Sequence, residues 1–235
     1  MQESAALPFR AAVFDMDGLL LDSEPFWMKA ERDAFASAGL ALSDADLCET
    51  IGMPIDEVAA HWFARRPWDI EAHPQEELVE AVVLRVIELI ESRGEPLPGV
   101  HKALELLSAA GLLLAVASSS PRRIIEPSLK ALGIREFFQV VHSAEQELRG
   151  KPDPAVYRST MDLLGLTAEQ CFALEDSVAG LQAAQAAGMK CILVAEPRQR
   201  DRPEMQTADL ALDSLEALDR EVLTRLGQPH STPLS

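Results

Sequence analysis

Two aspartates, Asp15 and Asp17, stand directly after an apolar run at 11–14 and just before Gly18. The run has the length and composition of a buried strand. Side chains alternate along a strand, so both carboxylates are expected on the same side. Two carboxylates at such short range repel each other unless a cation lies between them or they share a proton. One aspartate could then attack a substrate while the other moves a proton. The alternative is an Asx-turn with Gly18 at positive φ.

Two further polar stretches follow apolar runs and could hold an anion. Ser118 and Ser119 open a three-serine stretch after the run at 112–117. Hydroxyls and free backbone N–H groups at a strand-to-helix turn suit a phosphate or another oxyanion, although serine there is also an ordinary helix N-cap. Two prolines stiffen the loop around Lys151. A fixed ammonium could neutralise an anion, whereas most lysines are simply solvated.

A pair of acids, Glu175 and Asp176, follows the apolar run at 171–174. These acids could cap the helix that begins after them. Together with Asp15 and Asp17 they could instead bind Mg²⁺, which prefers a few carboxylate or carbonyl oxygens and keeps several waters. The four stretches supply a nucleophile, an acid/base, an oxyanion cradle, a cation and a metal site, which are the parts of a phosphoryl-transfer centre.

The elements that must position these residues are short strands separated by helix-length patterns. Such alternation predicts parallel β-α-β units with right-handed crossovers. Ligands bind at the carboxyl ends of the strands in such sheets, so the four polar stretches should meet at one edge. The expected strands lie at 11–14, 112–117, 138–141, 171–174, 191–194 and 210–212.

A long stretch after the first strand has helical periodicity and no strand signal. We therefore expect an α/β fold in which a Rossmann-like parallel sheet core carries an inserted α-helical cap domain. The predicted division is core at 1–22 with the first strand and catalytic loop, cap at 23–95, and the remaining core at 96–235. The end of the chain, 228–235, has the composition of a loose tail.

The composition indicates which partners and which cellular compartment to expect. The chain of 235 residues has a formal net charge of -17, which argues against nucleic acid, because binding its backbone requires clustered lysine and arginine. No apolar run reaches membrane-spanning length and no secretory signal is apparent, so we expect no membrane partner. The three cysteines are odd in number, and Cys171 and Cys191 lie in apolar segments, which favours buried free thiols in a cytoplasmic protein.

The ordered motifs F-D-M-D-G, A-S-S-S, G-K-P-D-P and L-E-D-S-V-A-G resemble those of the haloacid dehalogenase-like hydrolases, in the subgroup with a helical cap inserted after the first motif. The resemblance covers essentially the whole chain. It implies that Asp15 is a nucleophile forming an aspartyl-phosphate and that Asp17 is the acid/base. It also implies that Ser118, the backbone at Ser119 and Lys151 hold the phosphate.

The same resemblance implies a Mg²⁺ cofactor held by Asp15, the Asp17 carbonyl and Asp176, with Glu175 beside them. The segments at 22–27 and 62–68 resemble those of bacterial hexitol phosphatases and 2-deoxyglucose-6-phosphatases. The resemblance therefore implies a phosphatase acting on a small phosphorylated sugar or polyol, such as 2-deoxyglucose 6-phosphate or a hexitol phosphate. We expect it to act as a monomer.

Other functions remain open at this point. Phosphomutases such as β-phosphoglucomutase share the motifs. Those enzymes carry a histidine in the cap where this chain has Trp27, and an arginine where this chain has about Ile55, so this chain lacks both residues. Dehalogenases lack the equivalent of Asp17. A non-catalytic sugar-phosphate sensor, or a receiver-like module, is the alternative outside enzymes. Trp27 is expected to face the active site, whereas Trp62 and Trp68 are expected to pack within the fold.

Overall fold

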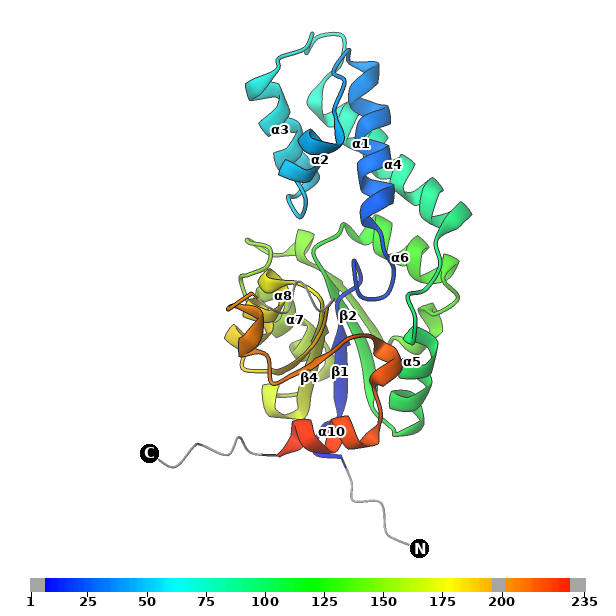
Figure 1. Ribbon diagram of the computed structural model, residues 1–235, viewed down its shortest axis with the longest axis vertical. Helices are drawn as coiled ribbons and strands as arrows, with labels where there is room; N and C mark the ends of the chain where they lie inside the picture. The colour runs from blue at the N-terminus through cyan, green and yellow to red at the C-terminus, as the bar shows by residue number, and fades with distance from the viewer. Residues whose placement is uncertain (1–6, 196–201, 229–235) are drawn as a thin grey trace, which may run out of the picture.

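The computed structural model describes residues 7–195 and 202–228. Its centre is a six-stranded parallel sheet in the order β3-β2-β1-β4-β5-β6 (Figure 1). The strands are β1 (Ala11–Phe14), β2 (Leu113–Ser118), β3 (Val140–Ser143), β4 (Cys171–Glu175), β5 (Lys190–Val194) and β6 (Leu210–Leu212). The predicted α/β fold with a parallel sheet is therefore confirmed. β1 is central, with β2 on one side and β4 on the other.

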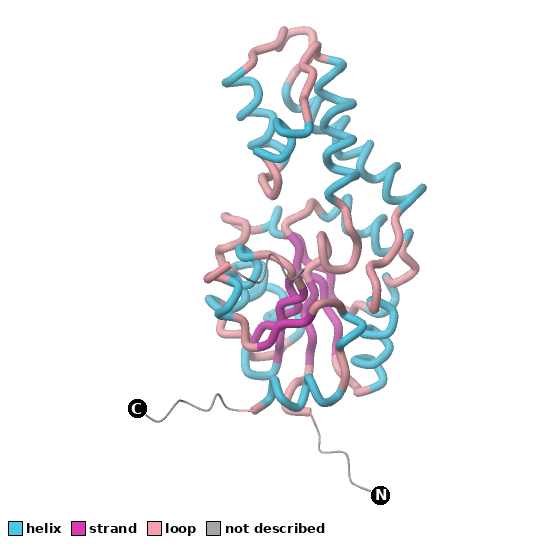
Figure 2. Tube along the Cα trace, viewed as in Figure 1, coloured by secondary structure: helices cyan, strands magenta, loops and turns pink. Residues whose placement is uncertain are grey.

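Helices cover both faces of this sheet (Figure 2). Residues alternate between the faces of a strand, so Phe14 packs on one side of β1 and Val13 on the other. The Phe14 face is covered by α5 (Val100–Ala109), α6 (Arg122–Ala131) and α10 (Arg220–Gly227). The Val13 face is covered by α7 (Ala155–Leu164) and α8 (Val178–Ala186). Burial on both faces explains why the central strands are almost wholly apolar.

Four helices and no strand lie between β1 and α5: α1 (Glu24–Ser37), α2 (Asp44–Glu49), α3 (Ile55–Arg65) and α4 (Gln75–Arg93). They form a second body beyond the carboxyl edge of the sheet (Figure 1). Its interior contains Phe35 and the almost fully buried Trp62. Ser43 caps α2 with a reciprocal capping box. This body has the helical character expected of the cap, and the exact boundaries at 23 and 95 stay a prediction.

The two chain segments that join the helical body to the sheet lie against each other. Leu21 forms an antiparallel bridge with Pro96, and the Leu97 N–H donates to the Leu20 carbonyl at 3.0 Å. Farther along, α4 packs against α6, where Arg123 and Glu80 form an ion pair. The first connection is thus anchored directly beside the loop that carries Asp15 and Asp17.

One strand, β3, lies two residues later in the chain than predicted. The sequence pattern favoured 138–141, whereas β3 is Val140–Ser143. Phe138 belongs instead to the core, where its ring meets that of Phe14 edge-on at 5.8 Å between centroids. Sheet pairing starts at Gln139, whose N–H donates to the Leu114 carbonyl at 2.9 Å. An apolar residue that packs in the core was therefore mistaken for the start of the strand.

The cysteines, the membrane-spanning potential of the helices and the end of the chain remain to be described. Cys171 and Cys191 are buried and Cys48 is exposed, and all three thiols are free. None of the described helices combines the length and the apolar character that crossing a bilayer requires. Apart from Gln228, the predicted tail at 228–235 lies outside the described residues.

Candidate active site

Asp15 lies at the carboxyl end of β1 and is only 7% exposed. Its N–H donates to the Leu174 carbonyl of β4 at 3.0 Å, which continues the sheet one residue beyond the strand. Lys151 donates to Asp15 Oδ1 at 2.6 Å and to the Ala117 carbonyl at 2.9 Å. The Asp15 carboxylate is therefore fixed in position by the central strands and by one buried ammonium.

The carboxylate of Glu175 is fully buried behind this pair. Lys151 donates to Glu175 Oε1 at 2.6 Å, and the Tyr157 hydroxyl donates to the same oxygen at 2.5 Å. Glu175 Oε2 accepts the Asp176 N–H at 3.2 Å and the Ser177 hydroxyl at 3.3 Å. Burying a charge is costly unless it is paired and hydrogen-bonded, and Glu175 satisfies that condition on both oxygens.

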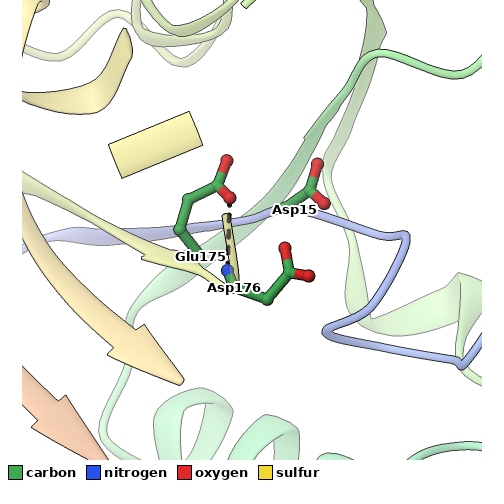
Figure 3. Close-up of side chains that lie close together, drawn as sticks. All are labelled: Asp15, Glu175 and Asp176. Atoms are coloured by element: carbon green, nitrogen blue, oxygen red, sulfur yellow. Dashed lines mark hydrogen bonds between the residues drawn. The ribbon is translucent and has the colours of Figure 1, made fainter. Parts of the chain in front are cut away.

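Three acids converge at this edge of the sheet: Asp15, Glu175 and Asp176 (Figure 3). One carboxylate oxygen from each lies within 4.8 Å of the others. Burial raises the pKa of Asp15 to about 7, even though attraction to Lys151 opposes the shift. Burial and repulsion from Asp15 and Glu175 raise the pKa of Asp176 to about 9. If all three acids were ionised, their charge would exceed that of the one ammonium beside them in a poorly solvated space, and the raised pKa values reflect both the burial and this imbalance.

This donor set fits a divalent metal ion. Mg²⁺ favours hard carboxylate oxygens and needs only a few from the protein, and its charge would offset the excess. The backbone is shaped to admit the acids: a Cβ on Gly18 would come within 2.1 Å of Asp176 Oδ2. Gly18 also has φ +79°, the positive φ that the alternative turn interpretation required, so both its space and its backbone require glycine.

The carboxylate of Asp17 has different partners. It accepts hydrogen bonds from the hydroxyls of Ser23 at 2.5 Å, Ser120 at 2.8 Å and Ser118 at 3.3 Å. Asp17 is more exposed than Asp15, and its carboxylate is not one of the three that converge. The two aspartates predicted to share one space therefore have separate surroundings in the structure: one is paired with lysine, the other with hydroxyls. The predicted metal ligand at this position is the Asp17 carbonyl, which stays a prediction.

The ammonium of Lys151 has its three hydrogens directed at Asp15, Glu175 and the Ala117 carbonyl. Burial alone would lower the pKa of Lys151, but attraction to the two carboxylates outweighs it and raises the pKa. Lys151 therefore remains charged and orders the acids. Ser119 is exposed just after β2, next to the buried Ser118. Phosphate binding by these residues stays a prediction.

A second contact positions the loop that carries Lys151. His142 of β3 is 6% exposed, and its Nε2 lies 2.6 Å from Glu147 Oε1. The hydrogen bond to His142 lowers the pKa of Glu147. Glu147 thus ties the start of the loop to the sheet four residues before Lys151.

The sequence motifs identified the right strand ends but left out several side chains of the site. Ser120 belongs to the three-serine stretch and Ser23 to the segment at 22–27 that resembles sugar phosphatases. The sequence analysis assigned neither serine a contact with Asp17. Both precede or begin helices, where serine usually caps, so the sequence carried no separate signal for them. Tyr157 lies on α7, 18 residues from Glu175, and only the packing of α7 on the sheet reveals it.

Comparison with known proteins agrees with this geometry. The chain matches the family model of the haloacid dehalogenase-like hydrolases over residues 12–194. It is 43% identical over 209 residues to hexitol phosphatase B of Escherichia coli K12, covering 88% of this chain and 93% of the relative. It is 31% identical over 186 residues to the phosphorylated carbohydrates phosphatase of Thermotoga maritima, covering 77% and 83%. The solved structure of CbbY from Rhodobacter sphaeroides with phosphate superposes with a TM-score of 0.81 at 27% identity, covering 89% of this chain and 96% of that one.

Proposed function

Because the chain belongs to the haloacid dehalogenase-like hydrolases, we propose that it is a Mg²⁺-dependent phosphatase that hydrolyses monophosphates of small sugars or sugar alcohols. The observation that carries the proposal is the separate environment of its two aspartates. Asp15 is an anionic oxygen donor held rigidly by Lys151. Asp17 stands beside it among three hydroxyls. A nucleophile and a proton carrier require such a division of roles.

In the first half of the proposed reaction a carboxylate oxygen of Asp15 attacks phosphorus. A bond forms between that oxygen and phosphorus, and the ester P–O bond breaks. Asp17 gives its proton to the departing alkoxide, so the sugar or polyol leaves as a neutral alcohol. Lys151 keeps the nucleophile in register by fixing Asp15 Oδ1.

In the second half Asp17 takes a proton from a water molecule, whose oxygen attacks phosphorus. The bond between phosphorus and Asp15 breaks, releasing inorganic phosphate and restoring the carboxylate. Ser23, Ser118 and Ser120 hold the Asp17 carboxylate in place through both steps. This order of events accounts for why one carboxylate is buried against a fixed cation and the other keeps some solvent contact.

Asp15, the Asp17 carbonyl and Asp176 would hold the Mg²⁺, with Glu175 behind them. When bound, the ion polarises the phosphoryl group and offsets the negative charge that builds up on it. The three converging carboxylates and the raised pKa values of Asp15 and Asp176 support this assignment.

The sugar or polyol class is supported by the relatives, one named a hexitol phosphatase and another a phosphorylated carbohydrates phosphatase. Assaying the purified chain against 2-deoxyglucose 6-phosphate, sorbitol 6-phosphate, mannitol 1-phosphate and β-glucose 1-phosphate tests it. We expect Mg²⁺-dependent release of inorganic phosphate from the first three. Conversion of β-glucose 1-phosphate to the 6-phosphate without phosphate release would instead indicate a mutase. Binding without turnover of any ester would indicate a sensor. We further propose that it acts as a monomer in the cytoplasm, consistent with its free thiols.

A further inference from the structure

The helix α6, which follows the three-serine stretch at 118–120, is capped from a different part of the chain. Its N-cap position is Pro121, whose side chain has no hydrogen-bonding group. The N–H of Arg122, the first residue of α6, donates instead to Glu145 Oε2 at 3.0 Å. Glu145 lies just beyond β3 and satisfies one of the N–H groups that the start of a helix leaves without an internal partner. The hydroxyls of the serine stretch are therefore available for other contacts.

The same stretch is attached to β3 a second time, through Ser143. Ser143 is fully buried at the end of β3 and lies opposite Ser118 in the parallel register with β2. Its hydroxyl donates to the Ser120 carbonyl at 2.7 Å and accepts the Glu145 N–H at 3.2 Å. Buried carbonyls require a donor, so Ser143 fixes the backbone at Ser120. We call Ser143 and Glu145 the β3 anchor.

Ser120 transmits this restraint to Asp17. The Ser120 hydroxyl donates to Asp17 Oδ2 at 2.8 Å, and the Ser120 N–H donates to Ser118 Oγ at 3.0 Å. The Ser118 hydroxyl also donates to Asp17 Oδ2, at 3.3 Å. The other oxygen, Oδ1, accepts from Ser23, which precedes α1 of the helical body. The position of Oδ2 relative to the sheet therefore depends on Ser118 and Ser120, and through Ser120 on the β3 anchor.

We propose that Ser143 and Glu145 act through Ser120 as positioning residues that orient the Asp17 carboxylate for proton transfer. This inference rests on the proposed phosphatase function, in which Asp17 protonates the departing alkoxide. A general acid must lie within hydrogen-bond distance of the leaving oxygen, about 2.6–3.2 Å. Loss of the β3 anchor would allow Ser120 to shift and would carry Asp17 Oδ2 out of that range.

The leaving group of the ester distinguishes this role from a purely structural one. The alkoxide released from sorbitol 6-phosphate is a strong base and must be protonated as the P–O bond breaks. p-Nitrophenolate is a stabilised anion that departs without a proton. Loss of folded enzyme lowers kcat/KM for both esters by the same factor, whereas misplacement of Asp17 lowers it mainly for the sorbitol ester. Because kcat/KM covers the steps up to release of the alcohol, the later activation of water by Asp17 does not enter.

The experiment measures the ratio of kcat/KM for sorbitol 6-phosphate to that for p-nitrophenyl phosphate. A displacement of about 1 Å costs roughly 100-fold, so Ser143→Ala should lower this ratio by at least about tenfold. Glu145→Ala, at an exposed position, should lower the ratio by about threefold or more, the factor that one hydrogen bond is worth. Glu145→Gln should restore the ratio, because the amide oxygen can still accept the Arg122 N–H.

A second comparison tests whether Ser143 acts through Asp17. The ratio is already low in Asp17→Asn, and adding Ser143→Ala should lower it by less than about twofold further, because residues that act through one group are not additive. The matched control is Ser128→Ala. Ser128 is fully buried in α6, and its hydroxyl donates to the Ile124 carbonyl at 2.7 Å. This bond is of the same kind and length as that of Ser143 but lies within a helix, so Ser128→Ala should keep the wild-type ratio.

Two results would overturn the role of the β3 anchor and leave the phosphatase function standing. One is an unchanged ratio in Ser143→Ala and Glu145→Ala. The other is the same fall on adding Ser143→Ala to Asp17→Asn as on adding it to wild type. If Ser143→Ala does not fold, the exposed Glu145→Ala decides alone. A wild type that hydrolyses p-nitrophenyl phosphate but no sugar or polyol phosphate would overturn the proposed function and this role with it.

Discussion

Replacing Gly180 by alanine tests whether the buried Glu175 really organises the site. Gly180 lies in the first turn of α8, and a Cβ there would come within 1.9 Å of the Glu175 carboxyl carbon and 2.0 Å of each of its oxygens. Lys151 and Tyr157 hold one of those oxygens from the other side. The carboxylate cannot retreat without breaking these bonds, and contacts this short are not tolerated.

The expected loss of stability follows from two opposed effects. Alanine in place of glycine inside a helix gains about 1 kcal/mol. Disrupting a buried charge pair costs about 3–5 kcal/mol. Gly180→Ala should therefore lower the free energy of unfolding by about 2–4 kcal/mol, a large part of the roughly 5–15 kcal/mol of a typical domain. Because Lys151 also fixes Asp15, a displacement of about 1 Å should reduce kcat by about 100-fold.

Urea denaturation with Mg²⁺ absent measures the first effect, and hydrolysis of p-nitrophenyl phosphate at saturating Mg²⁺ measures the second. Gly150→Ala is the matched control. Gly150 is adjacent to Lys151, but a Cβ there meets no atom within 4 Å and its φ is not positive, so both quantities should stay at wild-type values. If Gly180→Ala is within about 0.5 kcal/mol of Gly150→Ala and equally active, Glu175 does not organise the site and the reasoning is wrong.

Three other outcomes are expected. Asp15→Asn should remove essentially all turnover, and Asp17→Asn should remove most of it while phosphate still binds. In wild type, acid-quenched labelling with a ³²P-ester should detect the aspartyl-phosphate. An active Asp15→Asn enzyme would exclude that intermediate. In the metal-free protein the folded state keeps protons on Asp15 and Asp176 that the unfolded chain loses above the ordinary pKa of 3.8. The contribution of these two acids to the free energy of unfolding should therefore decline as pH rises through about 7 and 9. At pH 8, Mg²⁺ at 100 times its Kd should restore about 2.7 kcal/mol. A Tm at pH 8 that does not respond to Mg²⁺ would contradict the metal site. Tyr157→Phe, which removes one hydrogen bond to the buried Glu175, should cost about 1–3 kcal/mol in urea denaturation, and a neutral result would mean that Lys151 alone satisfies that oxygen.

The strand ends are well predicted from the sequence because they depend on local pattern. A fully buried strand must be apolar and must stop where polar residues begin, so the end of β1 follows from Phe14 and Asp15 alone. Since parallel strands end at one edge, the order of the motifs is enough to predict that Lys151 and Glu175 lie beside Asp15. Their hydrogen bonds confirm that placement.

What the sequence could not predict depends on packing between distant elements. The burial of Glu31 results from the way the helices between β1 and α5 fit together, and periodicity alone would assign an acid on a mixed helix face to the surface. The contact of Tyr157 with Glu175 requires α7 to lie across the sheet. The separation of Asp17 from Asp15 arises after the strand ends, because the chain turns at Gly18 and the alternation of strand side chains no longer applies.

The charge of the chain limits how a phosphorylated substrate could be held at this site. The net charge is -17, and the buried ammonium beside the aspartates, that of Lys151, already directs all its hydrogens to protein oxygens. A phosphate dianion entering this site would find few unpaired cations among the described side chains around it, so its binding depends on a metal ion and on neutral N–H and O–H donors. The energy to orient the ester must then come from the part of the substrate that does not react.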